Sequence, residues 1–175
     1  MSWKTSHRRG ETLRAVEHVA NDRRDGVLPM GVPGVAENFT DELDLVGALM
    51  LRWHARLSGN IERALADEPV DLPSAVAAAW RRTAEEMPGV RMVIDRSMSM
   101  PADPEMERAM NRAHDREATY LATAAGLSSG NSPAAVAAGR RVEKLARAGL
   151  EVHQIQQSET PSESFADRIR AVLAA

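Results

Sequence analysis

The chain has 175 residues, no cysteine and a net charge of −3 at pH 7, and 43% of its residues are hydrophobic. This length suits one domain with its own core, and a chain without cysteine has neither a disulfide framework nor a thiolate metal site. No apolar run approaches the roughly 18 residues that indicate a membrane span, and the N-terminus lacks the apolar core of a secretory signal. We therefore expect a cytoplasmic protein that does not insert into a membrane. Its 22 basic residues are 20 arginines and 2 lysines, a bias that we attribute to a high-GC bacterial genome.

The first predicted helix covers residues 5–24, where apolar residues recur at three- and four-residue spacing. The next segment, residues 26–36, contains two prolines and three glycines, which exclude regular structure. Because it is apolar, we expect it to fold down as a lid over one end of the helices. The alternative is a loop that binds a partner, since an exposed apolar patch normally marks an interface. The candidate partner-binding residues in this loop are Val27, Leu28, Met30 and Val32.

The clearest helical pattern lies in residues 40–66, where apolar residues recur at gaps of three and four. Asn38 or Thr40 is the predicted N-cap, and acidic residues occupy the first turn, where the helix dipole favours anions. Trp53 lies in the middle of the apolar stripe, so it is predicted to be buried. Gly59 within this helix predicts the close approach of another backbone.

Proline marks the boundaries of the next two helices. Pro73 suits the first turn of a third helix, on which Trp80 is predicted to face the core. The pair Pro88-Gly89 ends that helix. Residues 90–98 form either a short fourth helix or an extended apolar segment, and we favour the helix because the apolar residues keep the helical period.

Two further helices have strong start signals. Asp103-Pro104 and Ser132-Pro133 each combine an N-cap residue with a proline at the first helical position. Gly126-Leu127 is typical of a Schellman stop between them. The sequence therefore predicts an all-α helical bundle of five to six helices over residues 1–155, with no run that alternates for long enough to form a strand.

The C-terminal segment is predicted to differ from the bundle. Residues 156–163 have the polar composition of a linker, and residues 164–175 form a short amphipathic helix. This helix needs a surface on which to bury its apolar face, either on its own bundle or in the groove of a partner. The apolar face consists of Phe165, Ile169, Val172 and Leu173.

The chain lacks the side-chain patterns of common catalytic and metal sites. No Glu is followed three residues later by His, the spacing that carboxylate-bridged metal sites in helical bundles use. Gly126 to Gly130 matches the Gly-x-Ser-x-Gly motif, but its helical flanks lack the strand that a nucleophile elbow needs. We predict no catalytic residue, no cofactor and no metal, although a composite metal or polar site stays open. Its candidate residues are His54, His114, Glu62 and Glu117.

Methionine and arginine residues supply two weaker signals. Six methionines crowd into residues 87–110; we interpret them mainly as core filling, with an adaptable interface as the alternative. Two basic stripes on the fifth and sixth helices would meet phosphates if they were adjacent, but interleaved acidic residues favour a solvated face. The stripes consist of Arg108, Arg112, Arg116, Arg140, Lys144 and Arg147.

Together these features favour a non-catalytic helical protein that binds another protein as an adaptor or regulator. The first alternative is a nucleic-acid-associated regulator that uses the arginine stripes; the others are a helical-bundle metal-binding protein or another enzyme. A second copy of the chain is a further partner that the sequence leaves open.

Overall fold

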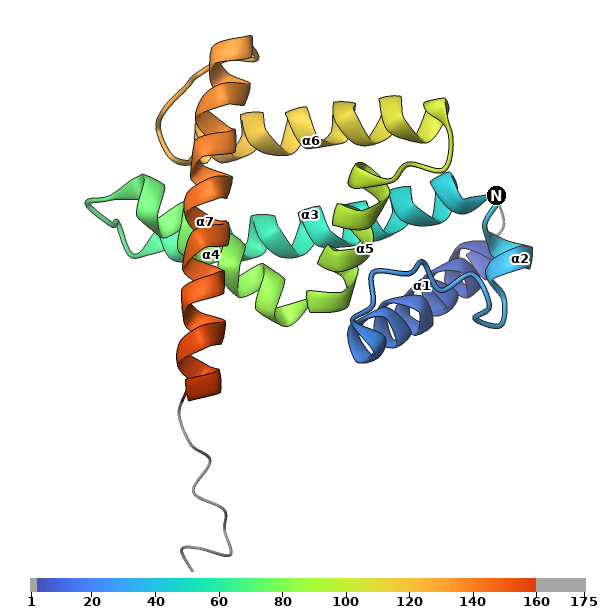
Figure 1. Cartoon of the computed structure of the whole chain (residues 1–175). Helices are drawn as coiled ribbons and strands as arrows, with labels where there is room; N and C mark the ends of the chain where they lie inside the picture. The colour runs from blue at the N-terminus through green and yellow to red at the C-terminus, as the bar shows by residue number, and fades with distance from the viewer. Residues whose placement is uncertain (1–2, 160–175) are drawn as a thin grey trace, which may run out of the picture.

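A computed structural model describes the backbone of residues 3–159 and the side chains of residues 7–150 (Figure 1). In this part of the chain there are seven helices and no strand, which confirms the all-α prediction. None of these helices is long and apolar enough to cross a membrane. In chain order the helices are α1 (Trp3–Arg23), α2 (Val35–Asn38), α3 (Glu42–Ala66), α4 (Leu72–Glu86), α5 (Pro88–Ser99), α6 (Pro104–Ala124) and α7 (Pro133–Glu159).

Aspartate caps fix the starts of α3, α4 and α6, and the cap of α4 is Asp71. The Asp103 carboxylate accepts the backbone N–H groups of the first turn of α6, as the sequence predicts. The N-cap of α3 is Asp41, which accepts the N–H of Asp44 at 2.8 Å, so the prediction of Asn38 or Thr40 is wrong. Asn38 instead ends α2, where its amide donates to the Gly34 carbonyl oxygen at 2.8 Å.

The predicted stop after α6 is confirmed by its hydrogen bonds. The N–H of Leu127 donates to the carbonyl oxygen of Ala122 at 2.9 Å, and that of Gly126 donates to Thr123 at 3.0 Å. This pair of bonds defines a Schellman motif. It needs a left-handed residue, and Gly126 has φ of 68°.

Helix α7 extends to Glu159, so the first four residues of the predicted linker are helical. Between Gly149 and Thr160 the sequence has neither proline nor glycine, and hence no residue that would break the helix. Residues 160–175 lie outside the described part of the chain. The rest of the predicted linker and the apolar face of Phe165, Ile169, Val172 and Leu173 belong to them.

Helix α3 runs through the middle of the molecule, as Figure 1 shows. It packs on α4 and α5, while α7 crosses α6 and α4, and α1 packs mainly on α5. Helix α6 runs in nearly the same direction as α3 (Figure 1), but it packs mainly on α7 and touches α3 at few points. The two helices are therefore held at a distance by their common neighbours.

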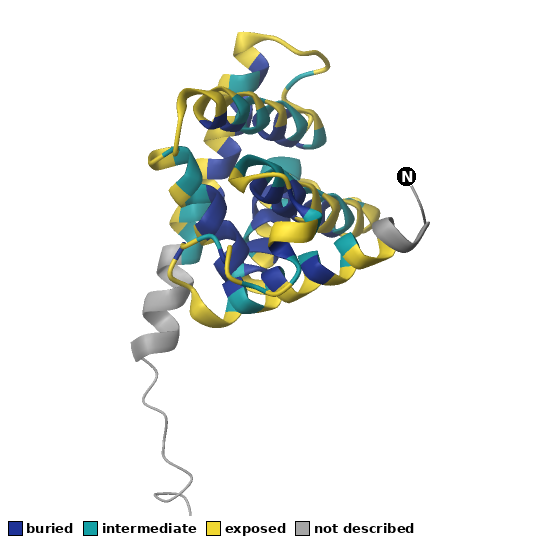
Figure 2. Ribbon diagram, turned by 90° about the vertical axis from the view of Figure 1, so that its right-hand side faces the viewer, coloured by how far each residue is buried: buried dark blue, intermediate teal, exposed yellow. Residues whose placement is uncertain are grey.

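The core is centred on two tryptophans, as predicted. Trp53 and Trp80 are both fully buried, and their rings meet edge to face with centroids 5.5 Å apart and planes at 72°, a favourable geometry for aromatic pairs. Figure 2 shows the buried residues gathered where the helices face one another, with exposed residues on the outer faces of the helices.

Two glycines allow helices to cross closely. A Cβ atom at Gly89 would lie 1.8 Å from the carbonyl oxygen of Ala20, and one at Gly139 would lie 1.7 Å from that of Ala118. The close approach predicted at Gly59 is wrong, because only the side chain of Arg63 comes near that position, at 3.8 Å.

Candidate functional site

A buried carboxylate joins the two tryptophans to α6. Glu117 is 4% exposed, and its two carboxylate oxygens accept hydrogen bonds from the indole N–H groups of Trp53 and Trp80, each at 3.1 Å. A buried carboxylate is costly unless it is paired and hydrogen-bonded. Glu117 meets both conditions, because the Nη1 atom of Arg91 lies 3.7 Å from it.

Arg91 extends this cluster to α5 and α7. Its guanidinium stacks over the Trp53 ring at 4.8 Å and forms an ion pair with Asp95 at 2.8 Å. Asp95 in turn accepts two hydrogen bonds from Arg147, at 3.0 and 2.8 Å. Opposite charges thus alternate from the buried Glu117 and Arg91 to the half-exposed Asp95 and Arg147, and they connect α5, α6 and α7.

Beside this cluster, an apolar groove of about 420 Å³ lies between α3 and α6. Leu51 on its wall is 72% exposed, far more than a leucine in a closed core would be. Gly47 widens the groove, because a Cβ atom there would meet nothing within 4 Å. The residues that line this α3–α6 groove are Leu43, Gly47, Met50, Leu51, His54, Ala109, Met110, Ala113 and Arg116.

The polar side chains of the groove are His54 and Arg116. The Nε2 atom of His54 lies 3.7 Å from the Glu117 carboxylate. Burial lowers the pKa of His54 below its ordinary value of 6.5, and the charges of Arg91 and Arg116 lower it further, whereas Glu117 opposes them. Burial therefore favours the neutral form of His54.

The composite site predicted from the sequence is divided in the structure. His54 lies by Glu117, but His114 lies 3.6 Å from Glu143 instead, and Glu62 accepts a hydrogen bond from Ser58. Among the described residues, no three His, Cys, Asp or Glu side chains gather as a metal site requires.

The predicted basic stripes come together only in part. Arg112 and Arg116 of α6 and Arg140 of α7 line one hollow of about 680 Å³, and Asp115 pairs with Arg140 there at 2.7 Å. Arg108 is exposed one turn earlier on α6. We call Arg108, Arg112 and Arg116 the arginine ridge; within the described residues none of the three forms an ion pair.

The remaining two basic residues lie apart from this hollow. Lys144 is exposed on α7. Arg147 instead stacks over the Trp80 ring at 4.9 Å and forms ion pairs with Asp95 and Glu143, so its charge belongs to the interior cluster.

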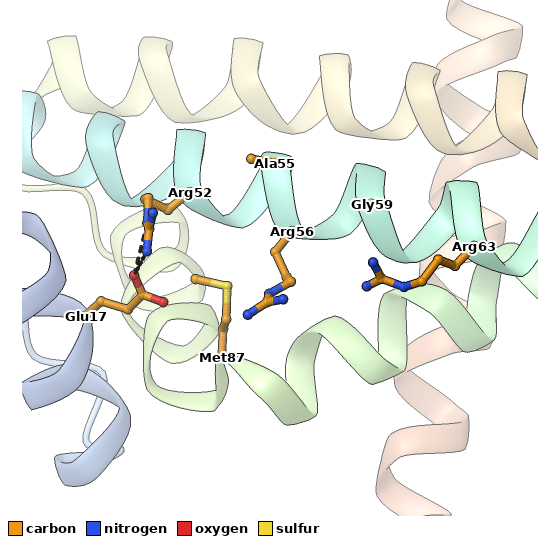
Figure 3. A pocket seen from close by; sticks show the side chains of 7 residues that line it. All are labelled: Glu17, Arg52, Ala55, Arg56, Gly59, Arg63 and Met87. Atoms are coloured by element: carbon orange, nitrogen blue, oxygen red, sulfur yellow. Dashed lines mark hydrogen bonds and ion pairs between the residues drawn. The ribbon is translucent and has the colours of Figure 1, made fainter. Parts of the chain in front are cut away.

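A second basic pocket, of about 280 Å³, lies on the opposite edge of α3 (Figure 3). Arg52 and Arg56 line it, but their charges are matched by Glu17 at 2.8 Å and Glu86 at 3.2 Å. The third arginine, Arg63, donates to the side-chain oxygen of Asn60. The pocket is less available to an anion than the ridge.

The predicted partner-binding loop is divided between core and surface. Leu28 and Val32 are half-buried and pack against the core, as a lid would, whereas Val27 and Met30 are 41% and 38% exposed. The methionines divide in the same way: Met87, Met106 and Met110 are buried, while Met92 and Met100 are exposed.

Sequence reasoning missed the groove, although two residues signalled it. Leu51 is apolar but lies off the stripe of α3 that contains Met50 and Trp53, and Glu117 is a carboxylate on the inward face of its helix. Neither signal indicates how far α6 lies from α3, because that distance depends on α4 and α5, which contact both helices. Comparison with protein-family models, curated proteins and solved structures gave no match to this chain.

Proposed function

We propose that the protein is a non-catalytic adaptor or regulator that binds a segment of a partner protein in the α3–α6 groove. The observation that carries this proposal is the exposed apolar wall of the groove, with Leu51 at 72% exposure. Apolar surface of this kind is stabilised when a partner removes it from water. A cytoplasmic location and a bacterial origin remain part of the proposal.

The polar groups behind the groove support binding rather than catalysis. Both oxygens of Glu117 accept indole hydrogen bonds, and Arg91 is held by Asp95 and by the tryptophan rings. A general base must reach the proton that it removes, and Glu117 faces these partners instead. The cluster supports the inner wall of the groove. Outside the groove, the exposed Val27 and Met30 of the loop before α2 are further candidate contacts for the partner protein.

Two glycines of α3 provide a matched test. Gly47→Leu would place a side chain in the groove, where a Cβ meets nothing within 4 Å. Gly59→Leu makes the same change in the second basic pocket, on the opposite edge of α3. Both should raise helix stability slightly, because leucine is the better helix former. The tagged full chain and both variants are used to capture proteins from cells that contain this protein, and the captured sets are compared by mass spectrometry.

We expect at least one protein that the wild type and Gly59→Leu retain and Gly47→Leu loses. Identical sets from all three chains would contradict the proposal, since a filled groove could not then bind like an open one.

A further inference from the structure

The apolar groove and the basic hollow share one residue. Arg116 lines both the α3–α6 groove and the hollow that α6 forms with α7. The arginine ridge follows the outer face of α6 between them. A ligand that fills the groove therefore meets the ridge along one of its sides.

The charge of the ridge is not balanced by its surroundings. Asp115, the carboxylate of the hollow, is held by Arg140 at 2.7 Å. The Arg116 Nε atom donates to the Arg112 carbonyl oxygen, which is a neutral partner. Among the described side chains, the guanidinium of Arg116 has no carboxylate counterion. Unpaired arginines at the rim of an apolar surface favour partners with carboxylates at the matching positions.

The other end of the groove has the opposite charge. Leu43 lies in the first turn of α3, beside Glu42, and the first turn of α6 carries Glu105 and Glu107. Both first turns lie at the same end of the helix pair (Figure 1). At this end the carboxylates of Glu42, Glu105 and Glu107 outnumber the one ridge arginine, Arg108, whereas the other end carries Arg112 and Arg116. The groove is therefore net acidic at one end and basic at the other, and this polarity would orient its occupant.

The length of the groove suits a helix. On α3 its residues run from Leu43 to His54, a distance of roughly 16 Å at about 1.5 Å per residue. Three turns of a partner helix would cover it, with apolar side chains at three- and four-residue spacing toward the groove.

Resting on the function proposed above, we infer that the occupant is an amphipathic helix of the partner protein whose carboxylates contact Arg112 and Arg116. The apolar face of this helix contacts Leu51 and Met50 across the space above Gly47. Its acidic residues lie toward the Arg116 end of the groove, and the end near Glu42 is neutral or basic.

A displayed peptide library tests this inference on the full chain. Peptides of about 16 residues keep an apolar helical stripe, while the remaining positions are drawn equally from Glu, Lys, Gln and Ser. Peptides that bind the wild type are then exposed to the Gly47→Leu variant, and those that also bind this variant are discarded. The peptides that remain depend on the groove. Their affinities are then measured by fluorescence anisotropy.

We expect the groove-dependent peptides to carry Glu clustered at one end. Their affinity should fall about tenfold or more, the lower range of electrostatic effects on association, in the double variant Arg112→Glu, Arg116→Glu. The control Arg141→Glu, Lys144→Glu makes the same change in net charge on α7 and should bind like the wild type. Peptides in which the clustered Glu residues are replaced by Lys should bind the double variant Arg112→Glu, Arg116→Glu again.

The other outcomes separate this inference from the proposed function. Groove-dependent peptides without clustered Glu would overturn the inference and leave the proposed function standing, whereas no groove-dependent peptide would overturn both. If a duplex DNA binds through Arg112 and Arg116 equally well in wild type and Gly47→Leu, the ridge serves nucleic acid and the inference fails. If light scattering shows a dimer that Gly47→Leu dissociates, the occupant is a second copy and the inference also fails.

Discussion

A single inward carboxylate organises the interior. Glu117 accepts hydrogen bonds from two tryptophans that come from different helices, and it lies near the charge of Arg91. Its position could be predicted from its place on the apolar face of its helix, but its partners could not, because they come from three other segments of the chain.

Removal of that carboxylate should destabilise the fold strongly. Glu117→Ala leaves two buried indole N–H groups without an acceptor, each at a cost of about 1–3 kcal/mol, and weakens the pairing of Arg91. We expect the free energy of unfolding to fall by at least about 3 kcal/mol in urea denaturation. Asn111→Ala, an exposed change on the same helix, should stay within about 0.5 kcal/mol of the wild type, and an equal effect of the two substitutions would contradict this role.

The ionisation of Asp44 makes the free energy of unfolding depend on pH. Its carboxylate accepts hydrogen bonds from Arg9 at 2.6 and 3.0 Å, and this pairing lowers the pKa of Asp44 from 3.8 to about 2 against the opposing effect of burial. A carboxylate whose pKa is lower in the folded chain stabilises the fold above its unfolded pKa and loses that contribution as the pH falls. The stabilisation is therefore complete above about pH 4 and disappears toward about pH 2.

Urea denaturation of wild type and Asp44→Asn at a series of pH values tests this dependence. The variant should be modestly less stable at pH 7, because both partners are partly exposed and exposed pairs contribute little. The difference should narrow as the pH falls below about 4; a constant difference would show that the charge of Asp44 does not matter.

At the scale of elements, local signals predicted the helices well. The Asp103 cap, the Pro88-Gly89 break and the Gly126 stop act within one or two turns, so the sequence contains all that they need. The sequence does not single out Asp41 as the cap, because Asn38 and Thr40 are equally suitable residues. In the structure Asn38 ends the short helix α2.

The crossing of α6 and α7 depends on one glycine. In Gly139→Ala the new Cβ would lie 1.7 Å from the carbonyl oxygen of Ala118, so the two backbones must separate. We expect a loss of about 3 kcal/mol or more in thermal or urea denaturation, at the upper end of overpacking costs. Gly59→Ala, which meets only an ordinary contact, should gain about 0.5–1 kcal/mol; a Gly139→Ala chain as stable as the wild type would contradict this crossing.

At the scale of the whole molecule, the candidate site arises from the spacing of helices. Arg147 belongs to the same predicted stripe as Arg140, yet α7 crosses α4 and turns it toward Trp80. Likewise, Met50 and Met110 lie on predicted core stripes and are buried, yet they line the groove beside the exposed Leu51. The stripe predicts which residues of α3 face the core, but only the tertiary arrangement leaves Leu51 exposed beside them.

The central claim is that the α3–α6 groove is the surface that binds a partner protein, and a single thiol tests it most directly. Because the chain has no cysteine, Leu51→Cys carries one attachment point for a benzophenone crosslinker, and Val70→Cys carries one in the exposed turn between α3 and α4. Each labelled protein is irradiated in extract from cells that contain it, and the adducts are identified by mass spectrometry. We predict a protein adduct at position 51 that is absent at position 70 and disappears when Gly47→Leu is added; the same adducts at both positions, or an adduct at 51 that persists with Gly47→Leu, would contradict the account.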